Sequence, residues 1–303
     1  MAGNPPHLWV DASERVLETC ILPLDASNHK GSSGRIAVLG GSEKYTGAPY
    51  YAAMAALYTG VDLATVYCAQ EAALPIKSYS PELMVAPVYE ARLFQSLSDK
   101  PDSHEARAAV QSMVNAVSLD RLHCLIVGPG LGRCTLVFRA LDAIVSRAQL
   151  KGVMLVFDAD ALHYLKDFQP TLGARVVLTP NAVERKILPD DLGDATVVVK
   201  GAIDSVQRCN RLLFECRETG GLKRSGGIGD VLAGATGALA AWQVILDERG
   251  LQSDLGLSSW AACCFVKQAT RRAFQEKGRA MTAPDVLRHL GPSIRHMLRD
   301  DCV

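Results

Sequence analysis

CLIVGPGLGRCTLVFRALDAIVSRA, residues 124–148, holds the pattern from which the fold can be predicted. It starts with a continuous apolar run at 124–128, as expected of a strand covered on both faces. A glycine-containing turn at 128–133 comes next. One apolar face at helical spacing then follows, made by Leu136, Val137, Ala140, Leu141, Ile144, Val145 and Ala148. A buried strand, a turn and an amphipathic helix are the repeating parts of a parallel α/β sheet.

Similar apolar runs occur on both sides of this stretch. They lie at residues 35–40, 64–68, 153–157, 175–178 and 196–200, and the Ala-rich segment 48–58 between two of them is helix-permissive. This alternation predicts an α/β fold with a mostly parallel central sheet, right-handed crossovers and helices on both faces. Because there is no internal repeat, low-complexity block or long linker, we expect residues 1–303 to form a single domain.

The composition excludes several classes of protein. Hydrophobic residues make up 49% and charged residues 21%, which is enough apolar material for a core and argues against disorder. The 32 Lys and Arg balance the 32 Asp and Glu, so neither nucleic acid nor an anionic membrane is expected as a main partner. The most apolar stretch, residues 231–246, is too short and too rich in Gly and Ala to predict a membrane span.

The cysteine pattern, the first residues and the absence of several motifs indicate the cellular compartment and exclude further kinds of site. The nine cysteines are odd in number and form no CxxC pair, which is typical of a reduced intracellular protein. The first residues lack a basic region followed by an apolar run, so we expect a cytoplasmic protein; a mitochondrial pool would need an alternative start. No HxH, HExxH, GxSxG or GxxxxGK[ST] pattern occurs, which argues against a zinc site, an α/β-hydrolase and a Walker A loop.

The sharpest chemical signal is GGLKRSGGIGD at residues 220–230. Gly226, Gly227 and Gly229 let the backbone approach a ligand closely, and a helix starting there would direct free N–H groups at an anion. An acid at that point, Asp230, repels the anion. Its position makes chemical sense if Asp230 takes a proton from a hydroxyl during transfer to phosphate. The alternative is an ordinary first-turn or capping residue.

Other loops that follow strands carry two interpretations each. The glycines at 128, 130 and 132 do not match GxGxxG, so GPGLGR is either a structural turn or a ligand loop. Asn181 and Glu184 resemble a capping box, and the alternative is that Glu184 holds a metal-bound water near phosphates. One of the two acids in FDADAL, Asp158 and Asp160, is expected near the ligand, although the sequence does not rank them.

Taken together, the motifs resemble the ATP-dependent NAD(P)H-hydrate dehydratases, a family with a ribokinase-like fold. The matching pieces are KGSSGRIAVLGGSEKYTGAPYYAA, IKSYSPELMV, LIVGPGLGR, FDADAL, LTPNAVE, VVVKGAID and GGLKRSGGIGDVLAG, in the family's order. The resemblance implies dehydration of the 6S hydrate of NADH or NADPH at the expense of ATP, with Mg²⁺ as cofactor and release of ADP and phosphate. It is also compatible with a homo-oligomer.

The resemblance also implies site residues. Asp230 would be catalytic and would lie beside both ligands. The residues implied for ATP are Lys200, Gly201, Ala202, Ile203, Asp204, Gly220, Gly221, Leu222, Lys223, Arg224, Ser225, Gly226, Gly227, Ile228 and Gly229. Those implied for the hydrated dinucleotide are Gly128, Gly130, Gly132, Asn181, Ala182, Val183, Glu184, Arg185, Lys186, Ile187 and Asp230.

Two features depart from the family pattern. Ile228 stands where Thr or Gln is expected, although the backbone N–H is the working group there. Only about a dozen residues lie between Glu184 and Thr196, near the minimum for a parallel crossover. Two other functions therefore stay open, a ribokinase-like kinase of a small alcohol and a non-catalytic nucleotide-binding relative. The sequence does not choose between NADH and NADPH hydrates, or between ATP and ADP as phosphoryl donor.

Overall fold

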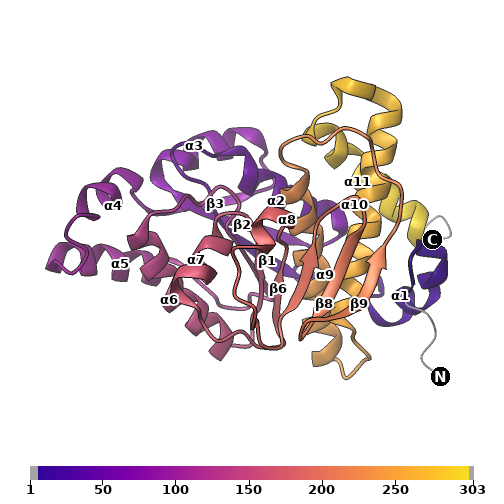
Figure 1. The fold of residues 1–303 in the computed structure, drawn as a ribbon, viewed down its shortest axis with the longest axis horizontal. Helices are drawn as coiled ribbons and strands as arrows, with labels where there is room; N and C mark the ends of the chain where they lie inside the picture. Colours follow the sequence, from indigo (N-terminus) through magenta and orange to yellow (C-terminus); the bar gives the residue numbers. More distant parts are fainter. Residues whose placement is uncertain (1–5, 300–303) are drawn as a thin grey trace.

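A nine-stranded sheet forms the centre of the protein, whose computed structural model describes residues 6–299 (Figure 1). The strand order is β3-β2-β1-β4-β5-β6-β7-β8-β9. The first seven strands of this order are parallel to one another. Strand β8 is antiparallel to β7, and β9 is antiparallel to β8. The strands are β1 Arg35–Leu39, β2 Leu63–Ala69, β3 Met84–Tyr89, β4 Cys124–Val127, β5 Met154–Phe157, β6 Val176–Leu178, β7 Thr196–Val199, β8 Asp204–Arg208 and β9 Arg211–Cys216.

The structure confirms the mostly parallel α/β sheet and all six strands predicted from apolar runs, each to within one residue at either end. Strands β3, β8 and β9 are absent from the prediction. They lie at or next to the edges of the sheet, where one side faces solvent. Buried and partly exposed residues alternate in β8 and in the second half of β9, and the first four residues of β3 are all partly or fully exposed. A strand covered on one side only lacks the continuous apolar run that identifies a central strand.

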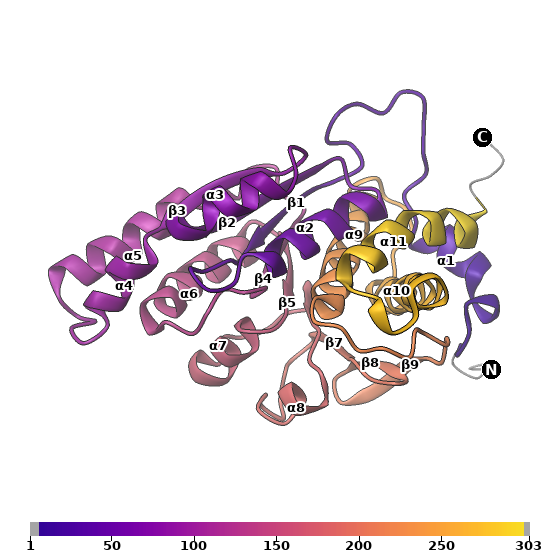
Figure 2. The same ribbon diagram turned by 90° about the horizontal axis from the view of Figure 1, so that it is seen from above.

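Helices cover both faces of the sheet (Figure 2). On one face, α2, α9 and α10 pack against the strands, and α11 packs outside α2 and α10. On the other face lie α5, α6 and α7. The helices are α1 Ser13–Thr19, α2 Gly47–Thr59, α3 Gln70–Tyr79, α4 Ala91–Leu97, α5 His104–Ala116, α6 Thr135–Leu150, α7 Ala161–Phe168, α8 Ala182–Arg185, α9 Ile228–Glu248, α10 Leu255–Lys277 and α11 Ala283–Leu298, with 3₁₀ turns at Trp9–Asp11 and Gly278–Ala280.

Helix α9 is the central helix of the fold. Every residue from Val231 to Leu246 is buried, and a Cβ on Gly234 would lie 2.1 Å from the backbone oxygen of Ala52, so α2 and α9 approach closely only because this residue is small. The helix is longer than the stretch predicted, and in length and composition it would suit a membrane span. However, 83% of its most apolar window is buried inside the protein, as in the core helix of a folded domain.

The short crossover between β6 and β7 is completed with a single helical turn, α8. Buried Leu188 and Leu192 and the buried Ala195 anchor the rest of the connection. The parallel pairing of the two strands is intact, with Val177 opposite Thr196 and Leu178 opposite Val197. The dozen residues after Glu184 are therefore sufficient to make this part of the sheet.

Candidate active site

A buried ion pair lies where the carboxyl ends of β5 and β7 meet. The Lys200 ammonium donates to Oδ1 of Asp158 at 2.6 Å, and the Thr179 hydroxyl donates to the same oxygen at 2.8 Å. The Asp158 side chain is 2% exposed. In contrast, Asp160 accepts hydrogen bonds from the backbone N–H of Gly132 and from the Arg133 guanidinium. The structure thus separates the two acids, with Asp158 in the buried network and Asp160 at the glycine loop.

Asp230 lies in the first turn of α9, next to this pair. The N-cap of the helix is Gly227, with φ +93°, so Asp230 is a first-turn residue and not the cap. The first intrahelical bond of the turn runs from Val231 N–H to the Gly227 oxygen. The N–H groups of Ile228 and Gly229 precede it and have no partner within the helix, which leaves them free for an anion. The presence of Ile228 in place of the expected Thr or Gln therefore leaves the backbone N–H donor intact.

The electrostatic surroundings of Asp230 suit a proton acceptor. Burial first, and then the negative charges of nearby carboxylates, raise its pKa to about 7, while Lys200 acts in the opposite direction; the carboxylates are those of Asp158, Asp160 and Glu184. No hydrogen-bond donor within residues 6–299 contacts its carboxylate. A carboxylate with a pKa near neutrality and no competing donor can accept a proton from a substrate hydroxyl.

The glycine loop after β4 is tightly packed at its start and open at its end. Gly128 has φ +115°, and a Cβ there would lie 1.9 Å from the Asp158 backbone oxygen. The next residue, Pro129, accepts a hydrogen bond from Gly41 N–H, which joins this loop to the one after β1. Around Gly132 the nearest atoms to a Cβ would be 3.8 Å away. The structural interpretation therefore holds for Gly128, while space remains beside Gly132.

Helix α10 supports both loops predicted to hold ATP. The Lys267 ammonium donates to the backbone oxygens of Gly201 and Ala202 at 2.8 and 2.7 Å, and it lies 3.4 Å from Asp204. One turn later, the Thr270 hydroxyl accepts a hydrogen bond from Gly221 N–H. Sequence reasoning missed this pair of residues. The available signal was two polar residues three apart, and so on one helix face, directly after the apolar run AACCFV.

Asn181 and Glu184 form the capping box. Asn181 Oδ1 accepts from the N–H groups of Val183 and Glu184 at 2.9 Å, and Glu184 Oε2 accepts from Asn181 N–H at 2.8 Å. Over residues 6–299, no group of three or more His, Cys, Asp and Glu side chains is arranged to hold a metal ion. Binding of a metal-bound water by Glu184 stays a prediction.

Tyr51 of α2 is another residue near Asp230 that the sequence did not indicate. A Cβ on Gly227 would lie 2.9 Å from the Tyr51 ring and 2.7 Å from Ala283, so a residue without a side chain is required here. Burial raises the Tyr51 pKa, and the Asp230 carboxylate raises it further. The aromatic ring therefore lies over the start of α9, on the side of the loop that follows β1.

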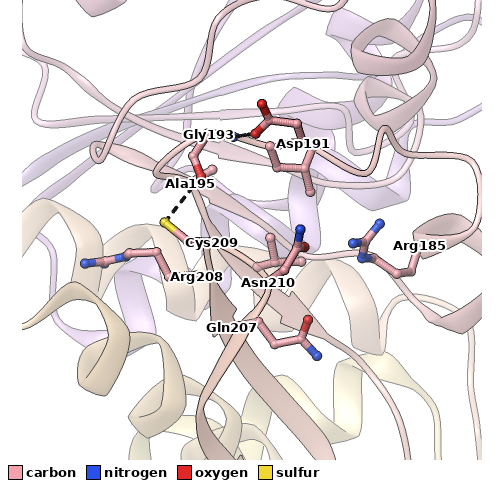
Figure 3. Close-up of a pocket in the computed structure, with 10 residues that line it drawn as sticks. Arg185, Asp191, Gly193, Ala195, Gln207, Arg208, Cys209 and Asn210 are labelled. Atoms are coloured by element: carbon pink, nitrogen blue, oxygen red, sulfur yellow. Dashed lines mark hydrogen bonds between the residues drawn. The ribbon is translucent and has the colours of Figure 1, made fainter.

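The side chain of one predicted substrate residue, Arg185, is directed at the β8–β9 hairpin. It lines a small cavity between the β6–β7 connection and the β8–β9 hairpin, where its side chain points toward Asn210 (Figure 3). Cys209 and Asn210 form the tip of the hairpin. The cavity volume is about 20 Å³, which is the size of a single water molecule and far too small for a nucleotide.

The sequence is similar to a known enzyme family over most of its length. A family model described as NAD(P)H-hydrate dehydratase matches residues 36–291. The bovine ATP-dependent (S)-NAD(P)H-hydrate dehydratase is 38% identical over 309 residues, covering 93% of this chain and 88% of its own. The enzyme of the same name from Batrachochytrium dendrobatidis is 37% identical over 324 residues, covering 96% and 99%.

Solved structures have the same fold. The ADP/ATP-dependent NAD(P)H-hydrate dehydratase of Bacillus subtilis, co-crystallized with ATP/Mg²⁺, superposes with a TM-score of 0.69 at 19% identity, over 98% of this chain and all of the other. A ribokinase-like superfamily protein of Enterococcus faecalis gives 0.68 at 20% identity, over 94% of each chain. Since the family match and the curated relatives extend over nearly the whole sequence, the chain belongs to the ATP-dependent (S)-NAD(P)H-hydrate dehydratase family.

Proposed function

We propose that this protein dehydrates the 6S hydrates of NADH and NADPH, using ATP and returning the reduced dinucleotide, ADP and phosphate. Family membership supports the reaction, and the observation that carries it in this chain is Asp230. This carboxylate lies in the first turn of α9, and its pKa is raised to about 7 by burial. A proton acceptor beside free helix N–H groups is the arrangement that transfer of a phosphoryl group to a hydroxyl requires.

In the proposed reaction Asp230 accepts the proton of the hydroxyl on the hydrated nicotinamide ring. The hydroxyl oxygen attacks the γ-phosphorus of ATP, and the bond to the β-phosphate oxygen breaks. The N–H groups of Ile228 and Gly229, at the positive end of the α9 dipole, stabilise the negative charge on the moving phosphoryl group. The ring-nitrogen lone pair then expels phosphate and, with loss of a ring proton, the double bond returns.

The remaining site residues follow the same proposal. The backbone of residues 200–204 and 220–229 would surround ATP, positioned by Lys267 and Thr270 of α10. The 128–132 loop and Asn181–Ile187 would border the hydrated dinucleotide. Lys200 N–H donates to the Pro180 oxygen at 2.8 Å, which joins the two groups of residues.

Mg²⁺ fits this site as an ion that arrives with ATP. Since the described residues offer no cage of several carboxylates, the ion would be held mainly by ATP phosphates and water, as is usual for Mg²⁺. The capping box uses only Oε2 of Glu184, so Oε1 would be available to a bound water. When bound, Mg²⁺ would neutralise phosphate charge. A cytoplasmic location, a homo-oligomeric state and the absence of nucleic-acid and membrane partners remain predictions.

Absorbance in the reduced-nicotinamide band tests the function. We expect ATP-dependent recovery of this absorbance from hydrated NADH with Mg²⁺, together with an equal amount of free phosphate. A phosphorylated alcohol product in place of free phosphate would support a small-alcohol kinase. ATP binding without turnover of either substrate, unchanged by Asp230→Ala, would support a non-catalytic relative.

A further inference from the structure

The Asp158–Lys200 pair is more deeply buried than a surface salt bridge and is held at both ends. The side chains of Asp158 and Lys200 are 2% and 18% exposed. Asp158 accepts from Lys200 and Thr179 on one oxygen, and the Lys200 backbone is tied to Pro180. Two charges removed from water in this way are costly unless each satisfies the other. The ammonium of Lys200 thus has a partner before any ligand binds.

Lys200 also lies against the first turn of α9. A Cβ on Gly229 would be 3.3 Å from its ammonium nitrogen, and Gly229 directly precedes Asp230. The charged and titratable groups that act on Asp230 come from four elements. They are Asp158 and Asp160 after β5, Lys200 after β7, Glu184 in α8 and Tyr51 in α2. Among these described residues Lys200 is the one cation, which makes it the natural partner for an unprotonated Asp230.

An unpaired lysine at this position would form an ion pair with Asp230. That pair would hold the carboxylate ionised and would also weaken it as a base, because the pKa of an acid falls beside a positive charge. In the structure the Lys200 ammonium donates to Asp158 instead, and none of the described residues donates a hydrogen bond to Asp230. Asp158 thus competes with Asp230 for the same cation.

We propose that Asp158, together with Thr179, is a positioning residue that holds Lys200 away from Asp230 and so keeps Asp230 free to accept the substrate proton. This inference rests on the proposed role of Asp230. It gives the Lys200 side chain a function other than contact with phosphate, while leaving its backbone in the predicted ATP loop. Asp158 acts through Lys200 and does not touch the reacting atoms.

The acidic limb of the kcat/KM–pH profile tests this arrangement. Asp158→Asn removes a negative charge and releases Lys200 toward Asp230, and both changes lower the pKa of Asp230. We therefore expect the limb to move to lower pH, with kcat falling about tenfold or more because the base is weaker. Lys200→Met should move the limb to higher pH. Asp160→Asn is the matched control and should give a smaller shift than Asp158→Asn, since it releases no lysine.

The double variant Asp158→Asn/Lys200→Met removes both charges of the pair. It should bring the limb back toward the wild-type position, and it tests the proposal even if one single variant does not fold. The proposal is overturned if both single variants leave the limb in place or move it in the same direction. It is also overturned if Lys200→Met raises the KM for ATP with no change in the limb, as a phosphate contact would.

A measurement without turnover separates this inference from the proposed function. Urea unfolding of the wild type and of Asp230→Asn, compared across pH, reports the titration of Asp230 in the folded protein. The comparison is then repeated with Asp158→Asn added to the wild type and to the Asp230→Asn variant. If Asp158→Asn lowers the pKa of Asp230, the proposal is supported even if the wild type fails to dehydrate the hydrate. If the pKa of Asp230 does not change, the proposal is contradicted even if the enzyme is active.

Discussion

Replacing Asp230 by Asn should stabilise the protein at neutral pH while removing its activity. Burial is the main reason that the pKa of Asp230 is raised from its ordinary value of 3.8 to about 7. In the unfolded chain the carboxyl ionises freely, so ionisation favours unfolding as pH rises between these two values. The difference in pKa corresponds to an upper limit of about 4 kcal/mol at pH 8. Asn has nearly the same shape and carries no charge, so the variant avoids this cost.

The pH dependence decides whether this reasoning is right. Below about pH 3 the carboxyl is neutral in both states, because this is well under its ordinary pKa of 3.8, and the two proteins should be equally stable. The advantage of Asp230→Asn should grow through pH 7 and level off above about pH 8, as measured by urea unfolding. The same variant should lose about 10²–10⁴ in kcat, because a general base contributes that much. An advantage that is absent at pH 8, or equal at pH 4 and pH 8, would refute the assignment of a buried, high-pKa carboxyl.

Three further predictions follow from the packing of the site. Gly128→Ala should cost at least about 3 kcal/mol of stability in urea unfolding, because its Cβ would lie 1.9 Å from a backbone oxygen. Gly132 also has a positive φ but has open space around it, so Gly132→Ala should cost only about 1 kcal/mol. Equal losses of stability in the two variants would contradict this difference. Lys267→Met should raise the KM for ATP several-fold with a smaller change in kcat, and an unchanged KM would show that the loop does not need this support. Asn181→Ala should lower stability by about 1 kcal/mol through loss of the capping box, with no effect expected if solvent replaced the cap.

The central strands and the general place of the site were predictable from the sequence alone. Continuous apolar runs such as residues 124–127 identify a strand covered on both faces, since no alternation is needed there. The glycines before Asp230 predicted a helix start with free N–H groups, and Gly227 does cap α9. The spacing of Asn181 and Glu184 was enough to predict their capping box, because that interaction is local.

Tertiary structure was needed for everything that depends on contact between distant segments. Asp158 and Asp160 are equivalent in sequence, and only the folded sheet brings Lys200, 42 residues away, onto the first of them. The support of the ATP loop by Lys267 likewise joins residues more than 60 positions apart. A pKa near 7 for Asp230 arises from burial and from charges on other segments, namely the loops after β5 and β7 and helix α8. Local sequence determines which backbone conformations form, whereas burial and charge pairing are properties of the assembled fold.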